Sequence, residues 1–320
     1  MSASVSGPNN LASEVPAVKE RGLPEGCLLI AAIIWGVGFV AQKSGMEHIG
    51  PWSYTGFRYA IATLGMLPLL LLPSRIGSDV PEHNRRSLWK PLLIGGGLAG
   101  LMIAIGGDLQ QAGIERTTAG KAGFITGLYV ILVPMLGLLV GYVVRPIVWV
   151  GACIAVAGLY LLSVQGVETI NTGDILVFLG TFAWAAQVLI IGWASPRSDP
   201  IRLAIIQTAI AAVLTLIAAA IVEGLSWQQA WAARWPLLYS GMLATSVAFT
   251  LQIIGQRKTS PALAAIILSL EAVFAAGAGW VYLDEQLDGK QLIGCGMMLI
   301  GILLSQVQSS KRTRFMTERD

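Results

Sequence analysis

Apolar runs of about twenty residues recur along the whole sequence. An α-helix rises about 1.5 Å per residue, so a run of this length crosses the hydrocarbon core of a bilayer, which is about 30 Å thick. Six of these runs contain no charged residue: 122–144, 146–167, 175–196, 203–222, 235–256 and 291–310. Four more contain one or two ionisable residues: 26–45, 51–74, 90–112 and 259–283. The pattern predicts an all-α integral membrane protein with ten transmembrane helices.

The positively charged residues are distributed unevenly over the predicted loops. Fifteen of the 21 Lys and Arg residues lie in the N-terminal tail, in the C-terminal tail and in every second loop, whereas the other loops hold only Arg116, Arg234 and Lys290. Loops rich in Lys and Arg stay on the cytoplasmic side of a membrane. We therefore expect both termini to be cytoplasmic, with a disordered tail at residues 1–25 and a second tail at 309–320.

The two halves of the chain resemble each other. GDLQQAGIERTTAG (107–120) aligns with FTLQIIGQRKTSPA (249–262) at an offset of 142, and the alignment pairs Gln110 with Gln252 and Gly113 with Gly255. The agreement indicates an internal duplication, with one repeat at 26–165 and the second at 173–308. Each repeat would hold five helices. Because five is odd, the second repeat enters the membrane from the opposite side, and the repeats are inverted.

Several longer segments resemble the ten-helix EamA-type members of the drug/metabolite transporter superfamily. They include IIWGVGFVAQKSG (33–45), TTAGKAGFITGLYVILVPMLG (117–137) and TSPALAAIILSLEAVFAAGAGWVYLDEQLDGKQLIGCGMMLIGILL (259–304). The resemblance covers about residues 26–308. It implies two EamA repeats and the export or exchange of small organic solutes, such as amino acids, other metabolites or drugs, through a central cavity.

Polar side chains at membrane depth identify the candidate site. They are unfavourable in lipid and therefore usually face a cavity or a partner. The predicted substrate-binding or coupling residues are Trp35, Phe39, Gln42, Asp108, Gln111, Trp184, Gln187, Gln252 and Glu271. Trp35, Phe39 and Gln42 share one helix face at i, i+4 and i+7, and Trp184 and Gln187 are spaced similarly. Packing in the protein interior is the alternative interpretation for the tryptophans.

The charged candidates each have two interpretations. Glu271 is either a carboxylate that exchanges protons or binds a substrate ammonium group, or a structural carboxylate. In the structural interpretation it is hydrogen-bonded to a neighbouring helix end or paired with a fixed cation. Asp108 either has a functional role in the site or forms an ion pair with Lys43 or Lys121. Arg58 and Lys43 are predicted to extend toward the interface or to clamp neighbouring helices.

Other functional classes fit the sequence less well. An enzyme would need a nucleophile–base pair or a set of metal ligands, and the only two histidines, His48 and His83, lie outside the predicted helix interiors. The three cysteines have neither metal nor disulfide spacing, and GGGLAG (95–100) lies within an apolar run with no preceding strand. We therefore predict no cofactor, no metal and no nucleic-acid partner.

The sequence as a whole predicts a multi-pass secondary active transporter in the cell (inner) membrane. It would export a small organic metabolite, such as an amino acid, or a drug by alternating access, driven by a proton or solute counter-gradient. A facilitative channel and a non-transporting receptor remain the alternatives, and an intramembrane enzyme is the least favoured. The oligomeric state is left open.

Overall fold

The computed structural model describes residues 22–71, 82–117, 119–163, 171–282 and 288–316, and these residues form helices without any strand. The first half holds α1 (Leu23–Gly45), α2 (Pro51–Met66), the 3-10 helix η1 (Leu67–Leu71), α3 (Glu82–Arg116), α4 (Ala119–Gly127), α5 (Tyr129–Leu139) and α6 (Pro146–Ser163). The second half holds α7 (Thr172–Ala194), the 3-10 helix η2 (Ser195–Arg197), α8 (Pro200–Val222), α9 (Trp227–Ala232), α10 (Arg234–Leu238), the π-helix η3 (Tyr239–Val247), α11 (Ala248–Gln256), α12 (Pro261–Leu268), α13 (Glu271–Tyr282) and α14 (Gly289–Met316).

Seven helical segments are long and apolar enough to cross a membrane. They are Leu23–Gly45, Trp89–Arg116, Ala122–Leu139, Thr172–Arg197, Pro200–Val222, Arg234–Gln256 and Pro261–Ala278. Two shorter apolar helices, Pro146–Leu161 and Gly289–Ser305, accompany them. Large apolar side chains such as Leu139 and Ile221 are about four-fifths exposed, which suits a surface facing lipid. The prediction of an all-α membrane fold is confirmed, whereas the count of ten helices stays a prediction.

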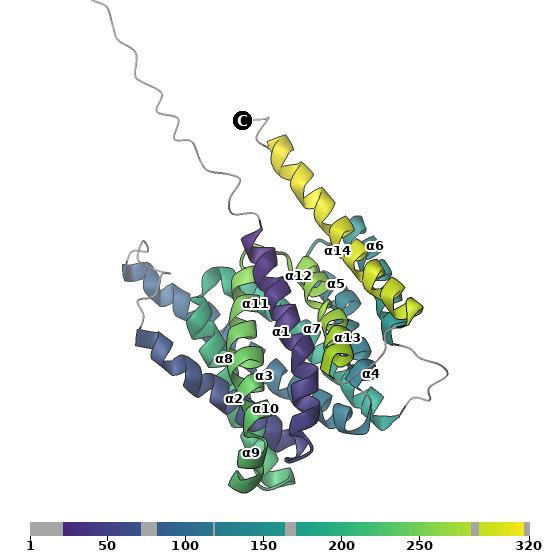
Figure 1. Cartoon of the computed structure of the whole chain (residues 1–320). Coiled ribbons are helices and arrows are strands. Elements are labelled where there is room, and N and C mark those ends of the chain that lie inside the picture. Colours follow the sequence, from purple (N-terminus) through teal and green to yellow (C-terminus); the bar gives the residue numbers. More distant parts are fainter. Residues whose placement is uncertain (1–21, 72–81, 118, 164–170, 283–287, 317–320) are drawn as a thin grey trace, which may run out of the picture.

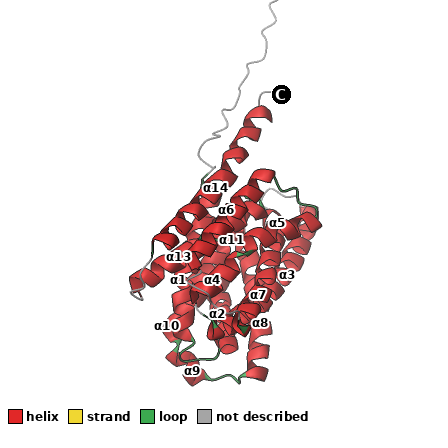
Figure 2. Ribbon diagram, turned by 90° about the vertical axis from the view of Figure 1, so that its right-hand side faces the viewer, coloured by secondary structure: helices red, strands yellow, loops and turns green. Residues whose placement is uncertain are grey.

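The first residues of α1 and the last residues of α14 lie at the same end of the helical bundle (Figures 1 and 2). We call this the tail end. The helix α14 continues to Met316, so the tail predicted at 309–320 begins inside a helix, and residues 1–21 and 317–320 lie outside the described residues. Pro91 lies inside α3, which begins at Glu82.

The matched glycines of the two halves make equivalent helix contacts. A Cβ atom added to Gly113 of α3 would lie 2.7 Å from the carbonyl oxygen of Gly173 at the start of α7. A Cβ added to Gly255 of α11 would lie 2.7 Å from the carbonyl oxygen of Pro24 at the start of α1. Each glycine thus lets the third helix of its half pack closely on the first helix of the other half.

Three predicted continuous runs are interrupted in the structure. The run 122–144 divides into α4 and α5 at Leu128, and 259–283 divides into α12 and α13 at Ser269 and Leu270. At the second break, Leu270 N–H donates to the carbonyl of Ile267, three residues back, and Ser269 Oγ donates to the carbonyl of Ile266 at 2.8 Å. Such side-chain bonds to the backbone bend helices. The run 235–256 contains the π-helix η3, another local change of winding.

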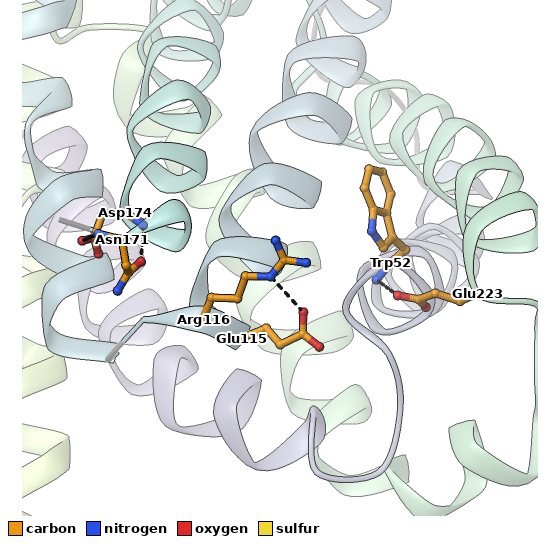
Figure 3. Close-up of polar contacts among 6 residues, drawn as sticks. All are labelled: Trp52, Glu115, Arg116, Asn171, Asp174 and Glu223. Atoms are coloured by element: carbon orange, nitrogen blue, oxygen red, sulfur yellow. Dashed lines mark hydrogen bonds and ion pairs between the residues drawn. The ribbon is translucent and has the colours of Figure 1, made fainter.

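A carboxylate joins the two halves at the end opposite the tails. Gly50, the N-cap residue of α2, has no side chain to cap the helix. Glu223, which follows α8, instead accepts hydrogen bonds from the N–H groups of Trp52 at 3.0 Å and Ser53 at 2.9 Å (Figure 3). The carboxylate satisfies free N–H groups and complements the helix dipole. Figure 3 also shows Asn171 and Asp174, which form a capping box at the start of α7.

Candidate functional site

A cavity of about 70 Å³ lies between the two halves. Its lining comes from α1, α2, α3, α4, α5, α7, η3, α11, α12 and α13, so both halves contribute. The lining includes seven of the nine predicted site residues: Trp35, Phe39, Gln42, Trp184, Gln187, Gln252 and Glu271. The volume holds only a few water molecules. The cavity must widen before it can accept an organic solute.

Aromatic rings form one wall of the cavity. The rings of Trp35 and Phe249 meet edge to face with centroids 5.1 Å apart, and the ring of Trp184 stacks on Phe249 at 6.3 Å. The two indoles come from the first helices of the two halves, α1 and α7. Trp35 Nε1 donates to the carbonyl of Ala244 at 2.7 Å, and Trp184 Nε1 donates to Gln110 Oε1 at 2.7 Å. Because each indole N–H has a partner, the rings are held in place at the cavity.

Two amides of the second half, one on α7 and one on α11, pair with each other in the cavity lining. Gln187 Nε2 donates to Gln252 Oε1 at 3.2 Å, and Gln252 Nε2 donates to Gln187 Oε1 at 3.0 Å. Both side chains are almost fully buried, with about 1% of their surface exposed. The reciprocal pair satisfies half of the hydrogen-bonding capacity of each amide and leaves one N–H and one oxygen lone pair on each.

Among the described residues, Arg58 supplies the positive charge of the cavity lining. Its Nη1 donates to Gln42 Oε1 at 3.0 Å and its Nη2 to the hydroxyl of Tyr59 at 3.0 Å, while its guanidinium carbon lies 4.8 Å from the centroid of the Tyr59 ring. The side chain is 7% exposed, so it does not extend toward the interface as the sequence suggested. The guanidinium clamps α1 to α2, which was the other predicted role, and it also faces the cavity.

Glu271 supplies the carboxylate of the cavity lining, as far as the described residues form it. It is the first residue of α13, where the positive end of the helix dipole favours a negative charge. The hydroxyl of Tyr129 lies close enough to interact with the carboxylate, but neither Tyr129 Oη nor Glu271 Oε1 has a hydrogen-bond partner of normal geometry in the described part of the chain. These two buried atoms are therefore available to a bound molecule.

Asp108 and Gln111 are not in the cavity lining. Asp108 Oδ2 accepts from Thr215 Oγ1 of α8 at 3.1 Å, so this face of α3 packs on α8. Pairing with Lys43 is not observed, since Lys43 is exposed, and the side chain of Lys121 lies outside the described residues. Gln111 is fully buried and neither of its amide atoms has a partner in the described residues.

Several lining residues were not among the predicted site residues. The polar and aromatic ones are Arg58, Tyr59, Gln110, Thr126, Tyr129, Thr245 and Phe249. The repeat alignment contained the signal for two of them, because Gln110 matches Gln252 and Tyr129 matches Glu271. The depth of Arg58 could have been estimated from Pro51, the first residue of α2, which places Arg58 about 10 Å along the helix.

The lining combines one cation, one carboxylate, several aromatic rings and unsatisfied hydroxyl and amide groups. Such a set can bind a small polar solute that carries charges of both signs, and it can hold an ammonium group against aromatic faces. No cluster of three or more His, Cys, Asp or Glu side chains that could hold a metal occurs among the residues that the structure describes. The arrangement is that of a binding site between two helical units.

Comparison with known proteins places the chain among transporters. The profile of the EamA-like transporter family matches residues 24–164 and 171–306. An uncharacterized transporter of Archaeoglobus fulgidus is 31% identical, over 92% of both chains. The uncharacterized inner membrane transporter YedA of Escherichia coli K12 is 25% identical, over 87% of this chain and 89% of its own.

A solved crystal structure shares the fold. Its TM-score is 0.69 at 17% identity, and the match covers 89% of this chain and 98% of the other. The resemblance to transporters that the sequence motifs indicated is confirmed, and with it a multi-pass location in the cell membrane. The chain belongs to the EamA-like transporter family of the drug/metabolite transporter superfamily.

Proposed function

We propose that this transporter is a secondary active exporter of a small metabolite that carries both an amine and a carboxylate, such as an amino acid. The observation that carries the proposal is the pair of opposite charges in one buried cavity. Within the part of the chain that the structure describes, Arg58 and Glu271 are the charged residues of its lining, and both are less than a tenth exposed. A zwitterion would match this pair, with its carboxylate on the guanidinium and its ammonium on Glu271.

The aromatic lining supports a cationic group near Glu271. Ammonium groups are attracted to the faces of tryptophan and tyrosine rings. Trp35, Trp184 and Tyr129 all line the cavity together with Glu271. A drug-sized ligand normally occupies several hundred Å³, so a small metabolite needs less widening of the present cavity than a drug does.

A second cavity at the tail end supports alternating access. It measures about 330 Å³ and includes Glu25, Arg145 and Lys258 in its lining. The helices α5 and α12 line both cavities at different positions along their lengths. Tyr129 of α5 and Leu268 of α12 line the central cavity. Val133 of α5 and Leu263 of α12 line the tail-end cavity. The buried layer of Val133, Leu189 and Leu263 therefore separates two polar spaces. Opening this layer would connect the central cavity to the tail side.

The helix breaks supply places at which such a movement can occur. Leu128 interrupts the fourth helix of the first half, and Ser269 and Leu270 interrupt the corresponding helix of the second half. Discontinuous helices at the midplane of inverted repeats are typical of secondary transporters. We propose ten transmembrane helices in two inverted repeats, 26–165 and 173–308, with the tail end in the cytoplasm. We also propose that a proton gradient or a counter-solute gradient drives transport.

A ligand screen followed by counterflow tests the proposal. Purified protein is first screened for thermal stabilisation by a metabolite panel, and the hits are then tested in proteoliposomes. For L-leucine we compare the intact zwitterion with 3-methylbutylamine, which lacks the carboxylate, and with 4-methylpentanoate, which lacks the amine. We expect saturable counterflow of the zwitterion and at least about tenfold weaker competition by either analogue, because each loses one charged contact.

Other outcomes identify the alternatives. Flux that does not saturate and shows no counterflow would indicate a channel. Stabilisation without flux would indicate a receptor. Equal competition by the amine and by the zwitterion would contradict a role for Arg58 in binding a substrate carboxylate.

A further inference from the structure

We propose that Asp108 is the second partner of Arg58, and that the guanidinium moves between a position facing the cavity and an ion pair with Asp108. In the first position Arg58 can bind the carboxylate of the solute, and in the second position it cannot. The inference rests on the proposed function for its meaning in transport, but the ion pair itself can be tested without any solute.

The backbone of α3 brings the two groups together. Arg58 lies on α2, and its Nη2 approaches the backbone at Gly107, where an added Cβ would lie 3.3 Å from it. Asp108 is the next residue along α3. A side chain at position 107 would overlap the Tyr59 hydroxyl, so the glycine lets this hydroxyl, and the guanidinium that donates to it, lie against α3.

Within the described residues, each of the two side chains has one buried polar atom without a hydrogen-bond partner. The Nη atoms of Arg58 are bonded to Gln42 and Tyr59, but its Nε has no partner. Asp108 Oδ2 is bonded to Thr215, but its Oδ1 has none. A buried charged group with an unsatisfied atom is strongly unfavourable. A rotation that joins Nε or an Nη atom to Oδ1 would satisfy both residues at once.

Among the residues that the structure describes, Arg58 is the positively charged group that acts on Asp108. The other charged group acting on this carboxylate is Glu223, which follows α8. The hydroxyl of Tyr59 from α2 and the hydroxyl of Thr215 from α8 lie beside it, and the Trp184 ring of α7 packs over Gly106, two residues earlier. Among these neighbours only Arg58 carries a positive charge.

The arrangement links the protonation of Asp108 to solute binding. When Asp108 is ionised, it attracts Arg58 and competes with the carboxylate of the solute. When Asp108 binds a proton, the ion pair is lost and the guanidinium returns to Gln42 and the cavity. A proton on Asp108 therefore favours solute binding, and Asp108 acts as a positioning residue through Arg58.

A double-mutant cycle on thermal stability tests the ion pair. The variants are Asp108→Asn, Arg58→Gln and the double variant, each in detergent without solute, with unfolding followed by tryptophan fluorescence. Each single change leaves one buried charge without its partner, whereas the double change removes both charges. We therefore expect the melting temperature of the double variant to fall by at least about 2 °C less than the sum of the two single decreases. Additive losses would overturn the ion pair. Glu47→Gln with Arg58→Gln is the matched control, and this pair should be additive because the Glu47 side chain is exposed and lies outside this network.

The pH dependence of transport supplies an independent measurement that a purely structural Asp108 would not alter. In proteoliposomes, the KM of the wild-type protein for L-leucine should rise between pH 6 and pH 8 by about threefold or more. In Asp108→Asn the KM should stay near the wild-type value at pH 6. A variant profile that follows the wild type would overturn the proposal. If L-leucine is not transported at all, the proposed substrate class fails while the thermal cycle still decides on the ion pair.

Discussion

Tyr129 and Glu271 occupy equivalent positions in the two halves and face each other in the central cavity. They are 142 residues apart, the offset at which the repeats align, and each is the first residue after a helix break, Tyr129 in α5 and Glu271 in α13. Both side chains are about 5% exposed and interact across the cavity. The duplication therefore placed two different side chains at one location, a hydroxyl opposite a carboxylate, and the cavity is chemically asymmetric although the backbone is repeated.

Tyr129→Phe tests the hydroxyl of this pair. Tyr129 Oη has no hydrogen-bond partner of normal geometry in the described residues, so its removal should change the melting temperature by less than about 2 °C. If the hydroxyl helps to bind a solute at Glu271, the apparent affinity in counterflow should fall by about five- to tenfold. Unchanged affinity in a stable variant would show that Tyr129 only fills space.

Glu271→Gln tests the carboxylate. Glutamine keeps the shape of the side chain and removes its charge, so the variant should fold and should bind a zwitterion at least about tenfold more weakly. Transport should also lose its dependence on pH if Glu271 exchanges protons. Glu47→Gln, a change to an exposed residue after α1, is the control. Transport that is unchanged in both rate and pH profile would leave Glu271 with a structural role.

Trp35→Ala and Trp184→Ala test the aromatic wall. Each indole packs on Phe249 and lines the cavity, so truncation should weaken solute binding by about tenfold or more and should also lower stability by several kcal/mol. Phe substitutions at the same positions separate the two effects, because Phe keeps a ring and loses the N–H bond. Wild-type kinetics in both alanine variants would contradict a role in binding.

Much of the site follows from helix periodicity. Trp35, Phe39 and Gln42 reach one cavity because they lie on a single face of α1, and a polar face on an otherwise apolar helix is visible in the sequence. On α3 the same reasoning did not identify the face that lines the cavity. Asp108 and Gln111 share a face that packs away from the cavity, while Gln110, turned by about 100° from Gln111, lines it.

The remaining features depend on tertiary packing. All faces of α3 carry small or apolar residues along most of its length, so the sequence does not distinguish the face that meets α8 from the face that meets the cavity. The breaks at Leu128 and at Ser269 lie in apolar runs that contain no proline at the break, and they arise from local turns that periodicity does not reveal. The burial of Arg58 likewise depends on Gln42 and Tyr59, two partners that only the fold brings to it.

Gly36→Ala tests whether the position of Glu271 depends on the contact between α1 and α13. A Cβ at Gly36 would lie 2.6 Å from the carbonyl oxygen of Glu271 and 2.8 Å from the backbone nitrogen of Ala275. Backbone atoms cannot rotate away from the added methyl group as a side chain can, so α13 must move away from α1. We expect this movement to lower the free energy of unfolding by about 1–3 kcal/mol. Because Trp35 lies beside Gly36, this movement should also weaken solute binding.

Gly26→Ala on the same helix is the matched control. A Cβ at Gly26 meets no atom within 4 Å, so alanine should leave stability unchanged or raise it by up to about 1 kcal/mol through its higher helix propensity. Both variants replace glycine by alanine in α1, so they differ only in the space around the added methyl group. If the Gly36→Ala and Gly26→Ala variants have equal stability and bind the solute equally well, α13 can shift at Glu271 without an effect on either property. Solute binding in the cavity would then not require the close contact of α1 and α13.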